Sequence, residues 1–404
     1  MNTASQDMSE LPLAGITVID LGQVYQGPYA TFLMAKAGAD IIKVEPLGGE
    51  PARVRAEVSA GATLPFEMLN ANKRSITLNL KTDHGRQLLL DLVRDADVLV
   101  ENFAPGVMDR LGVGWEKLRQ INPRLVYGSG SGYGLSGPDR DNLAMDVTIQ
   151  AVSGVMSVTG LPDGEPLRAG PAIADFLGGI HLYAGIMTAL VQRGRTGKGR
   201  LVEVAMQEAV FPTLASSLGL AHEMQAEPPR TGNRHSGLAV APYNVYPTSD
   251  GFVAIIALRE GHWDALLTLI GREDLRDDQR FTSNASRVAN VEEMDEVVAS
   301  WTRQFSSAEV FERAKLGRVP CAPVRTVLEV LNDPHMHERG MLEWVDNPRL
   351  GRVVLPNSPL RFHGADLVPP TPSPELGEHT AMILAEKLGL SDQDIAELKR
   401  EKAI

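Results

Sequence analysis

The sequence predicts an α/β protein, in which a large domain with a mainly parallel, Rossmann-like sheet is joined to a smaller α+β domain. Short apolar segments alternate with helical patterns through the first half of the chain, as in a parallel sheet covered on both faces. After about residue 226 the composition shifts to a segment rich in Pro, Gly and Arg. The length of 404 residues also exceeds the size at which one hydrophobic core usually stops growing.

The first half supplies the elements of the predicted sheet. Continuous apolar runs indicate strands buried on both faces, and the longer patterns between them indicate helices. In chain order we expect strands at 16–20, 39–45, 75–80, 97–100, 124–127 and 200–204, and helices that begin at Gly27-Pro28, near residue 84 and near residue 207. A glycine loop is expected after the strand at 124–127, and a buried helix over 176–191.

The smaller domain is expected over residues 226–331, between a large domain of residues 1–225 and a return to it over 332–404. Its first part, Ala226–Pro242, indicates a linker or a mobile loop. A strand pair at 244–247 and 252–256 and several amphipathic helices should follow. The returning segment is expected to end in helices.

Net charge and cysteine content narrow the class of protein. The net charge of −12 argues against a broad nucleic-acid-binding surface, while it allows a local basic pocket for an anionic cofactor. The single cysteine, Cys321, fits a reducing compartment, and its apolar neighbours predict an unreactive thiol. Residues 1–11 lack the pattern of a signal peptide, and the apolar segment 176–191 is too short to span a bilayer. We therefore expect a cytoplasmic protein without nucleic-acid or membrane partners.

Glycines after the fifth expected strand form a weak nucleotide-binding signal. The spacing Gly-x-Gly-x-x-Gly is met only from Gly132, which lies past the strand end and is not followed by an apolar helix. These glycines would let a ligand approach the backbone closely, and a plain tight turn explains them equally well. A nicotinamide-dependent oxidoreductase is therefore a distant alternative.

Basic residues near two strands could serve an anionic cofactor. Lys73, Arg74 and Lys81 surround one strand, where a solvated sheet edge is the alternative interpretation. Pro105 favours a helix start that would bring free N–H groups and Arg110 to the ligand edge of the sheet. His335 and His337 lie in an expected turn and predict no metal site.

Asp175 stands at the start of the long apolar segment. A carboxylate there can cap the helix, and on these residues alone capping is the better-supported interpretation. A carboxylate held against an activated electrophile can also act as a covalent catalyst.

The order of motifs resembles the class III CoA-transferases, the CaiB/BaiF family that includes formyl-CoA transferase and carnitine CoA-transferase. The resemblance runs from about Leu13 to the C-terminus. It is carried by Leu13–Asp20, Gly27-Pro28, Gly38–Glu45, Asn72–Ile76, Glu101-Asn102-Phe103 with Pro105-Gly106, Asp109–Gly112, Thr196–Gly199 and Leu376–Thr380.

The resemblance implies roles for particular residues and an assembly. Asp175, followed by Gly179-Ile180-His181, matches the acyl-carrying nucleophile of the family. The residues that match CoA contacts of the family are Tyr25, Gln26, Leu78, Asn79, Leu80, Lys81, Asn102, Phe103, Ala104, Arg110, Ser131, Gly132, Tyr133 and Gly134. An intertwined homodimer is implied as well, with CoA and acyl-CoA as substrates and no metal or redox cofactor.

Three departures from formyl-CoA transferase limit the resemblance. Pro46 and Ser131 stand where that enzyme has basic residues, so the nucleotide must be held differently. The glycine-rich loop of that enzyme has no clear counterpart, and Leu238–Pro242 is the candidate for its place. A formyl/oxalate substrate pair is therefore not expected.

The sequence thus predicts an enzyme that moves CoA from an acyl-CoA donor, with succinyl-CoA as a candidate, to a carboxylic acid through a covalent aspartyl intermediate. Backbone N–H groups of Gly132, Gly134, Gly178 or Gly179 are the expected oxyanion donors. Arg230, Arg234 and His235 are candidates to bind a second carboxylate.

Two further functions stay open. The related α-methylacyl-CoA racemases have a catalytic histidine where this chain has Met145, which cannot move a proton. An isomerase of that kind is therefore the second hypothesis, and a non-catalytic acyl-CoA-binding protein is the third.

Overall fold

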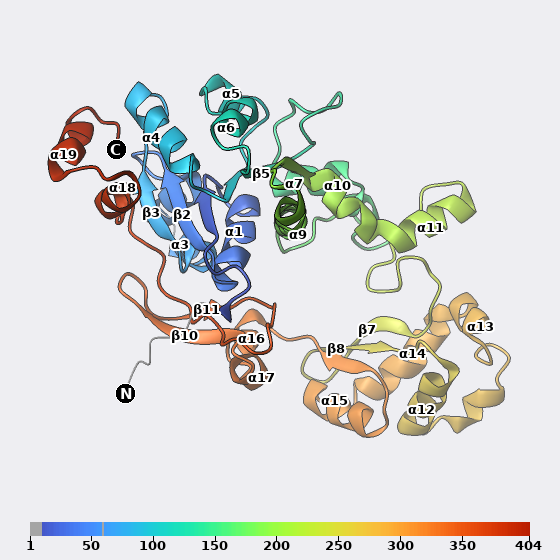
Figure 1. The fold of residues 1–404 in the computed structure, drawn as a ribbon. Coiled ribbons are helices and arrows are strands. Elements are labelled where there is room, and N and C mark those ends of the chain that lie inside the picture. The colour runs from blue at the N-terminus through green and yellow to red at the C-terminus, as the bar shows by residue number, and fades with distance from the viewer. Residues whose placement is uncertain (1–9, 59) are drawn as a thin grey trace. The chain divides into compact units, whose positions relative to one another are not determined.

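A computed structural model of the chain describes residues 10–58 and 60–404 and contains a six-stranded parallel sheet (Figure 1). The sheet has the order β3-β2-β1-β4-β5-β6, and every neighbouring pair is parallel. Its strands are β1 (Thr17–Asp20), β2 (Asp40–Glu45), β3 (Arg74–Thr77), β4 (Val98–Glu101), β5 (Val126–Ser131) and β6 (Leu201–Ala205). This is the strand order of a Rossmann-type sheet, and the predicted mixed α/β fold with a parallel sheet is confirmed.

Helices cover both faces of this sheet, because successive side chains of a strand point to opposite sides. Val18, Ile41 and Val98 pack with α1 (Gln26–Lys36) and α9 (Ile173–Thr196). The next residue of each strand, such as Ile19 and Leu99, packs on the opposite face. The helices on that face are α4 (Asp83–Val93), α6 (Trp115–Ile121), α18 (Thr380–Leu388) and α19 (Asp392–Arg400).

Helix α9 is longer than the apolar segment that predicted it. Its 24 residues are long and apolar enough to cross a membrane by length and composition, so the sequence-based estimate of its length was wrong. A core helix passes the same test, and here Leu182, Ile186 and Ala189 are buried in the cluster that contains sheet residue Val126. The helix therefore packs on the sheet as a core element of this unit.

The glycines after Val126 belong to a strand, and the predicted glycine loop begins only after Ser131. A Cβ atom at Gly128 would lie 2.7 Å from the Cδ1 atom of Ile186, and one at Gly130 would lie 2.7 Å from the side chain of Gln26. Glycine is required here because helices pack closely against the strand, which local sequence patterns do not reveal.

The helix that the sequence predicted to begin near residue 207 is divided. It consists of α10 (Met206–Val210), the 3-10 helix η2 (Phe211–Leu214) and α11 (Ala215–Met224). Pro212 lies in the divided region and lacks the backbone N–H group that a continuous helix would use.

The chain forms two compact units. The larger unit contains residues up to Ser153, Pro171–Val210 and Leu331–Ile404, and the smaller contains Gly154–Gly170 and Phe211–Val330. The sequence placed the start of the smaller unit at residue 226 and did not include 154–170. Within the smaller unit, the N–H group of Gly232 donates to the carbonyl of Gly160 over 3.0 Å, which joins the two segments.

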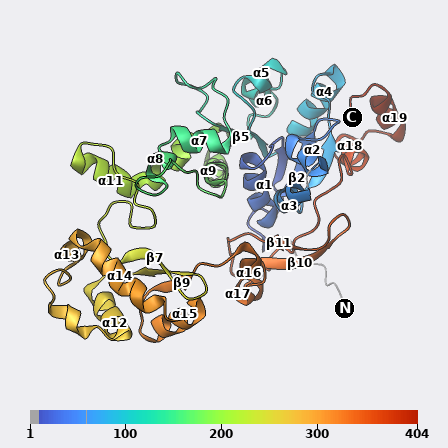
Figure 2. The ribbon, with the colours of Figure 1, turned by 180° about the vertical axis from the view of Figure 1, so that it is seen from behind.

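The smaller unit contains the predicted strand pair. Strands β7 (Tyr243–Pro247) and β8 (Phe252–Ile256) pair antiparallel, and β9 (Cys321–Pro323) adds a third strand. Residues of α12 (Glu260–Ile270), α14 (Val291–Thr302) and α15 (Ser307–Leu316) form one buried cluster with this sheet. Figure 2 shows this unit from behind.

Further helices and strands complete both units. In the larger unit they are α2 (Pro51–Val58), α3 (Ala60–Asn70), α5 (Val107–Arg110), α7 (Asp146–Val152), α17 (Pro334–Glu338) and the antiparallel pair β10 (Leu342–Asn347) and β11 (Gly351–Pro356). In the smaller unit they are α8 (Val155–Val158), η3 (Glu273–Asp277) and α13 (Asn284–Ala289), and α16 (Val327–Leu331) lies at the boundary.

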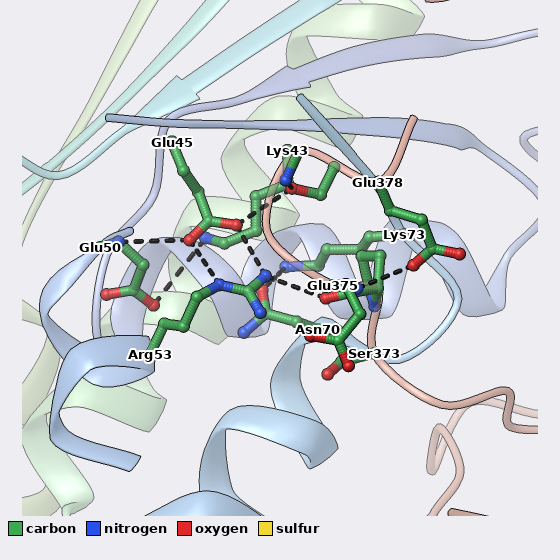
Figure 3. Close-up of polar contacts among 12 residues, drawn as sticks. Lys43, Glu45, Glu50, Arg53, Asn70, Lys73, Ser373, Glu375 and Glu378 are labelled. Atoms are coloured by element: carbon green, nitrogen blue, oxygen red, sulfur yellow. Dashed lines mark hydrogen bonds and ion pairs between the residues drawn. The ribbon is translucent and has the colours of Figure 1, made fainter. Parts of the chain in front are cut away.

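Buried charges join the ends of β1, β2 and β3 (Figure 3). The Asp20 Oδ2 atom accepts hydrogen bonds from Lys73 Nζ (2.9 Å) and Thr31 Oγ1 (2.7 Å), and neither charged side chain is exposed. Burial opposes ionisation of Asp20, but Lys73 and Lys43 outweigh it and hold the Asp20 pKa below its usual value. Burial lowers the pKa of Lys73 to about 8. Lys73 is thus a buried structural partner of Asp20, and neither sequence-based interpretation, a cofactor-binding cation or a solvated sheet edge, describes it.

A second pair extends the cluster towards α2. The Arg53 guanidinium donates to both carboxylate oxygens of Glu45, over 2.9 and 2.8 Å, and Lys43 Nζ donates to the carbonyl of Gly22 over 2.9 Å. Arg74, the other cation expected near a cofactor, pairs with Asp40 and Glu386.

Substitution of Lys73 by Ala should lower the free energy of unfolding by about 3–5 kcal/mol, because Asp20 would be left as an unpaired buried charge. Urea unfolding followed by circular dichroism measures this loss. The matched substitution Lys117→Ala, at an exposed position of α6, should change stability by less than about 0.5 kcal/mol. Equal effects of the two substitutions would contradict the assigned role.

Candidate active site

The candidate site lies where the strand order of the sheet reverses. Strands β1 and β4 are neighbours at the middle of the sheet. The chain continues from β1 to β2 and β3 in one direction, and from β4 to β5 and β6 in the other. Open α/β sheets bind ligands in the crevice that this reversal creates at the carboxyl ends of the strands. The loops that follow β1 and β4 carry Gln23–Gln26 and Asn102–Ala104, which include several of the residues predicted to contact CoA.

Asp175 lies in the first turn of α9 and lines a cavity of about 410 Å³. The side chain is nearly buried, with 8% of the residue exposed. The predicted site residues that line the same cavity are Gln26, Asn102, Phe103, Ala104, Ser131 and Gly132. The structure therefore brings the predicted nucleophile and six predicted CoA contacts to one place.

Asp146, and not Asp175, caps the start of α9. Its Oδ2 atom accepts hydrogen bonds from the N–H groups of Ala174 (2.8 Å) and Asp175 (3.2 Å), and its Oδ1 atom accepts one from Gln150 Nε2 (2.6 Å). The capping role that the sequence favoured for Asp175 is therefore filled by a residue of α7. The Asp175 carboxylate has no hydrogen bond to any described residue and remains available to a ligand.

The environment keeps Asp175 partly protonated near neutral pH. Burial in the cavity wall, and then the like charge of Asp146, raise the pKa of Asp175 to about 7. Carboxylates with raised pKa values in a cavity are typical of functional sites.

Gln26 presents an unpaired donor beside Asp175. Its Nε2 atom is buried and has no hydrogen-bond partner among the described residues. A Cβ atom at Gly130 would lie 2.7 Å from this side chain, and one at Gly178 would lie 2.8 Å from Nε2. Gly178 follows Asp175 by three positions on α9, so both residues lie on one face of the helix. The Gln26 amide is therefore held between a strand and that face.

Of the other predicted CoA contacts, four line a second cavity and four line neither cavity. Leu78, Asn79, Leu80 and Lys81 line a cavity of about 230 Å³. Gln23 and Phe103 line this cavity as well as the one that contains Asp175, so the two adjoin. Four predicted contacts line neither cavity, namely Tyr25, Arg110, Tyr133 and Gly134.

Several of these residues have structural partners. The side-chain amide of Asn102 pairs with both backbone groups of Gln23, over 2.7 and 3.0 Å. The Ser131 hydroxyl accepts from the N–H group of Gly134 over 2.9 Å, and the Tyr25 ring lies 6.0 Å from that of Phe176. Asn102 and Ser131 thus shape the loops that line the cavity.

Other residues of the cavity were not found from the sequence. Arg55 of α2, Arg140, Leu143 and Met206 line it together with Met145. No local pattern marks Arg55, and its place depends on how α2 packs.

A larger hollow, of about 840 Å³, lies between the C-terminal half of α9 and β6 and contains no predicted site residue.

The histidines and arginines singled out elsewhere have local partners. Arg230 donates to the carbonyl of Leu161, Arg234 pairs with Asp295 over 2.8 Å, and His235 Nδ1 accepts from the N–H group of Gly237. His337 Nε2 contacts the carbonyl of Leu331 over 2.8 Å. Over residues 10–58 and 60–404, no group of three or more His, Cys, Asp or Glu side chains could hold a metal ion.

Comparisons with known proteins identify the family of the chain. The chain matches the model of CoA-transferase family III over residues 13–380. It is 39% identical to the formyl-CoA:oxalate CoA-transferase of Streptomyces avermitilis, over 97% of this chain and 99% of that protein. It is 36% identical to the succinate–glutarate CoA-transferase of Agrobacterium fabrum, over 93% of this chain and 95% of that protein. A crystal structure of a CaiB/BaiF family protein from Brucella suis superposes with a TM-score of 0.81 at 36% identity, over 93% of this chain and 99% of that one.

Substitution of Asp175 by Asn should stabilise the protein at alkaline pH. From about pH 4 to 7 the folded protein retains a proton that the unfolded chain releases, so wild-type stability falls as pH rises through this window. The Asn variant lacks this penalty and should be more stable than wild type by up to about 4 kcal/mol at pH 8, with little difference at pH 4. Melting temperatures at pH 4, 6 and 8 measure the effect.

The exposed Asp163→Asn substitution is the control and should leave the pH dependence unchanged. If Asp175→Asn and wild type lose stability in parallel between pH 4 and 8, the Asp175 pKa is not raised.

Proposed function

The chain belongs to CoA-transferase family III, and we propose that it moves CoA from an acyl-CoA donor to a free carboxylic acid through a covalent intermediate on Asp175. The observation that carries this proposal is the Asp175 carboxylate, freed from helix capping by Asp146, in a cavity at the ligand edge of the sheet. Relatives named as formyl-CoA:oxalate and succinate–glutarate CoA-transferases support transfer between an acyl-CoA and an acid.

The reaction needs one nucleophile and no net proton transfer. The ionised Asp175 attacks the thioester carbonyl, the C–S bond breaks, and CoA thiolate leaves a mixed anhydride. The thiolate then attacks the aspartyl carbonyl, which releases the first acid as a carboxylate and leaves an enzyme–CoA thioester. The second acid attacks this thioester, and the same steps in reverse order give the new acyl-CoA and free Asp175.

The raised pKa of Asp175 suits this chemistry. At neutral pH about half of the Asp175 carboxyl groups are ionised, and an ionised group with a raised pKa is the more basic nucleophile. Both the anhydride and the thioester are uncharged at Asp175. Each acylation therefore removes the negative charge that burial and Asp146 disfavour.

Gln26 is the proposed donor to the oxyanion of each tetrahedral intermediate. The N–H group of Gly134 is bonded to Ser131, and Gly178 and Gly179 lie at interior positions of α9, where N–H groups bond within the helix. These three glycines are therefore poor candidates, contrary to the sequence-based hypothesis, and Gly132 alone of the four lines the cavity. The free Nε2 group of Gln26 can donate without giving up another bond.

The two adjoining cavities suit the two ends of CoA. The reacting thioester belongs in the cavity of Asp175, and the nucleotide belongs in the cavity of Leu78–Lys81, where Lys81 supplies a positive charge. A nucleotide held in place keeps the released thiolate near Asp175, so the second attack is effectively intramolecular.

Met145 distinguishes this proposal from an isomerase. It lines the cavity of Asp175, and its thioether cannot exchange a proton with a substrate carbon. The neighbouring Asp146 is occupied by the N–H groups of α9 and by Gln150.

The proposal includes a cytoplasmic, intertwined homodimer that acts on small molecules and uses no metal or redox cofactor. The net charge of −12, the single cysteine and the family resemblance support it. Sedimentation analysis tests the dimer.

Replacement of Asp175 by Ala or Asn should abolish transfer while CoA still binds with an affinity close to that of wild type, because the nucleophile is not part of the nucleotide site. Wild type incubated with acetyl-, propionyl- or succinyl-CoA and then hydroxylamine should carry a hydroxamate on Asp175, detected by peptide mass spectrometry. Asp163→Asn should keep full activity. Near-normal turnover of either Asp175 variant would contradict the assignment of Asp175 as the nucleophile.

Replacement of Gln26 by Met, which keeps the volume and removes the donor, should lower kcat by about 10²–10³-fold. The KM for acyl-CoA should change much less, since the bond forms in the tetrahedral intermediate. Steady-state kinetics measure both constants, with the exposed Gln87→Met substitution as control. A rise in KM with unchanged kcat would show that Gln26 only binds CoA.

A further inference from the structure

Two arginines line the cavity that contains Asp175, and the mechanism above uses neither. Arg55 lies on α2, and Arg140 lies in the loop that follows β5. Both residues are exposed at the molecular surface while they line the cavity. Cations in a cavity where acids react must affect which acids enter.

Arg55 is free to bind a ligand. It makes no hydrogen bond or ion pair with any residue that the structure describes, and Arg140 pairs only with its neighbour Asp141, over 3.2 Å. Arg53, two positions before Arg55 on the same helix, is buried and bonded to both oxygens of Glu45. On helix α2, Arg53 thus forms a buried ion pair with Glu45, whereas Arg55 lines the cavity.

The arginines come from other segments than the reacting carboxylate, since Arg55 lies on α2, Arg140 lies in the loop after β5, and Asp175 lies on α9. A guanidinium close to Asp175 would favour its ionised form. The influences on Asp175 are burial and the charge of Asp146, and both disfavour ionisation. Neither arginine is among the influences that raise the Asp175 pKa.

Apolar side chains form much of the remaining wall. Val24, Leu143, Met145 and Met206 line the cavity together with Asp175 and the two arginines. The lining thus combines a carboxylate that can react, apolar side chains and two cations, which suits a ligand with a reacting carboxyl group, a short aliphatic body and a second anionic group. Arginine recognises a carboxylate through two parallel hydrogen bonds.

We propose that Arg55, assisted by Arg140, binds the distal carboxylate of a dicarboxylic substrate whose two carboxyl groups are separated by a short aliphatic spacer. Glutarate and succinate have this form, whereas oxalate has no spacer. The inference rests on the proposed CoA transfer and makes Arg55 a specificity-determining residue of the same cavity.

Phosphate groups of CoA are the other anions that Arg55 could meet. The thioester and the nucleotide lie at opposite ends of the pantetheine arm. Arg55 shares a cavity with Asp175, whereas Lys81 lines the adjoining cavity together with Leu78–Leu80. This placement puts Arg55 at the acyl end, and the experiment below separates the two ligands through the KM for the donor.

The test compares glutarate with butyrate, which is glutarate without its second carboxylate. With acetyl-CoA as donor, no distal carboxylate enters on the donor side. Arg55→Gln should lower kcat/KM for glutarate by about 10–100-fold, the range of a lost charged hydrogen bond, and leave butyrate within about two-fold. The KM for acetyl-CoA should not change.

Three further variants sharpen the result. Arg55→Lys should restore part of the preference for glutarate, and Arg140→Gln should lower it less than Arg55→Gln does. Arg119→Gln is the matched control, because Arg119 is an exposed helical arginine that pairs with Glu116 and lines neither cavity.

Two outcomes would overturn the inference while CoA transfer stands. One is a wild-type enzyme that uses butyrate as well as glutarate. The other is an Arg55→Gln variant that loses both acids equally or has a higher KM for acetyl-CoA. Absence of a hydroxamate on Asp175 and of transfer to any acid would instead overturn the proposed function, and this inference with it.

Discussion

The buried charge cluster beneath the loop that follows β1 is the constraint on which the site depends. Asp20 and Lys73 are both fully buried, and such a pair persists only while each satisfies the other. The same cluster holds the loop, because Gly22 donates its N–H group to Asp20 and receives a hydrogen bond from Lys43. Val24 can therefore occupy a left-handed conformation, with a φ of 59°, that a β-branched residue rarely adopts. The next turn places Gln26 with its amide in the wall of the cavity. A charged framework thus fixes a loop whose own sequence would not adopt this shape.

Two carboxylates, Asp146 and Asp175, lie at the start of α9 and have different roles. Asp146 takes the N–H groups of the helix, and Asp175 is left without a protein partner. If Asp175 accepted those bonds itself, its charge would be stabilised and its carboxylate would be a weaker nucleophile. Instead, the charge of Asp146 adds to burial and raises the pKa of Asp175 to about 7. Capping by a neighbouring helix therefore stabilises the start of α9 and leaves the carboxylate of its first turn free, as the proposed mechanism requires.

The sequence predicted what depends on local pattern and missed what depends on packing. Apolar runs predicted the parallel sheet correctly, because a strand covered on both faces must be apolar along its length. The position of Asp175 at the start of an apolar helix was also predicted from the sequence. The role of Asp146 was not, because the residues it caps lie 28 positions along the chain. Gly128 and Gly130 suggested a loop. They lie in β5, where Ile186 and Gln26 pack so closely that a Cβ atom would not fit. Lys73 was considered for a cofactor site because no residue near it in the sequence shows that the buried Asp20 is its partner.

The proposed reaction requires a cavity that keeps Asp175 nucleophilic and also attracts anionic substrates. Positive charge beside Asp175 would attract any acid, but it would also lower the Asp175 pKa and weaken the nucleophile. Positive charge placed elsewhere in the same cavity avoids this conflict, because it acts on the far end of a substrate. Asp146 disfavours a negative charge on Asp175, and Arg55 and Arg140 contribute positive charge to the wall of the same cavity. In the proposed binding mode, a dicarboxylate is held by the carboxyl group that does not react. Its other carboxyl group reaches Asp175 as an uncharged thioester or attacks Asp175 when that residue carries CoA and no charge.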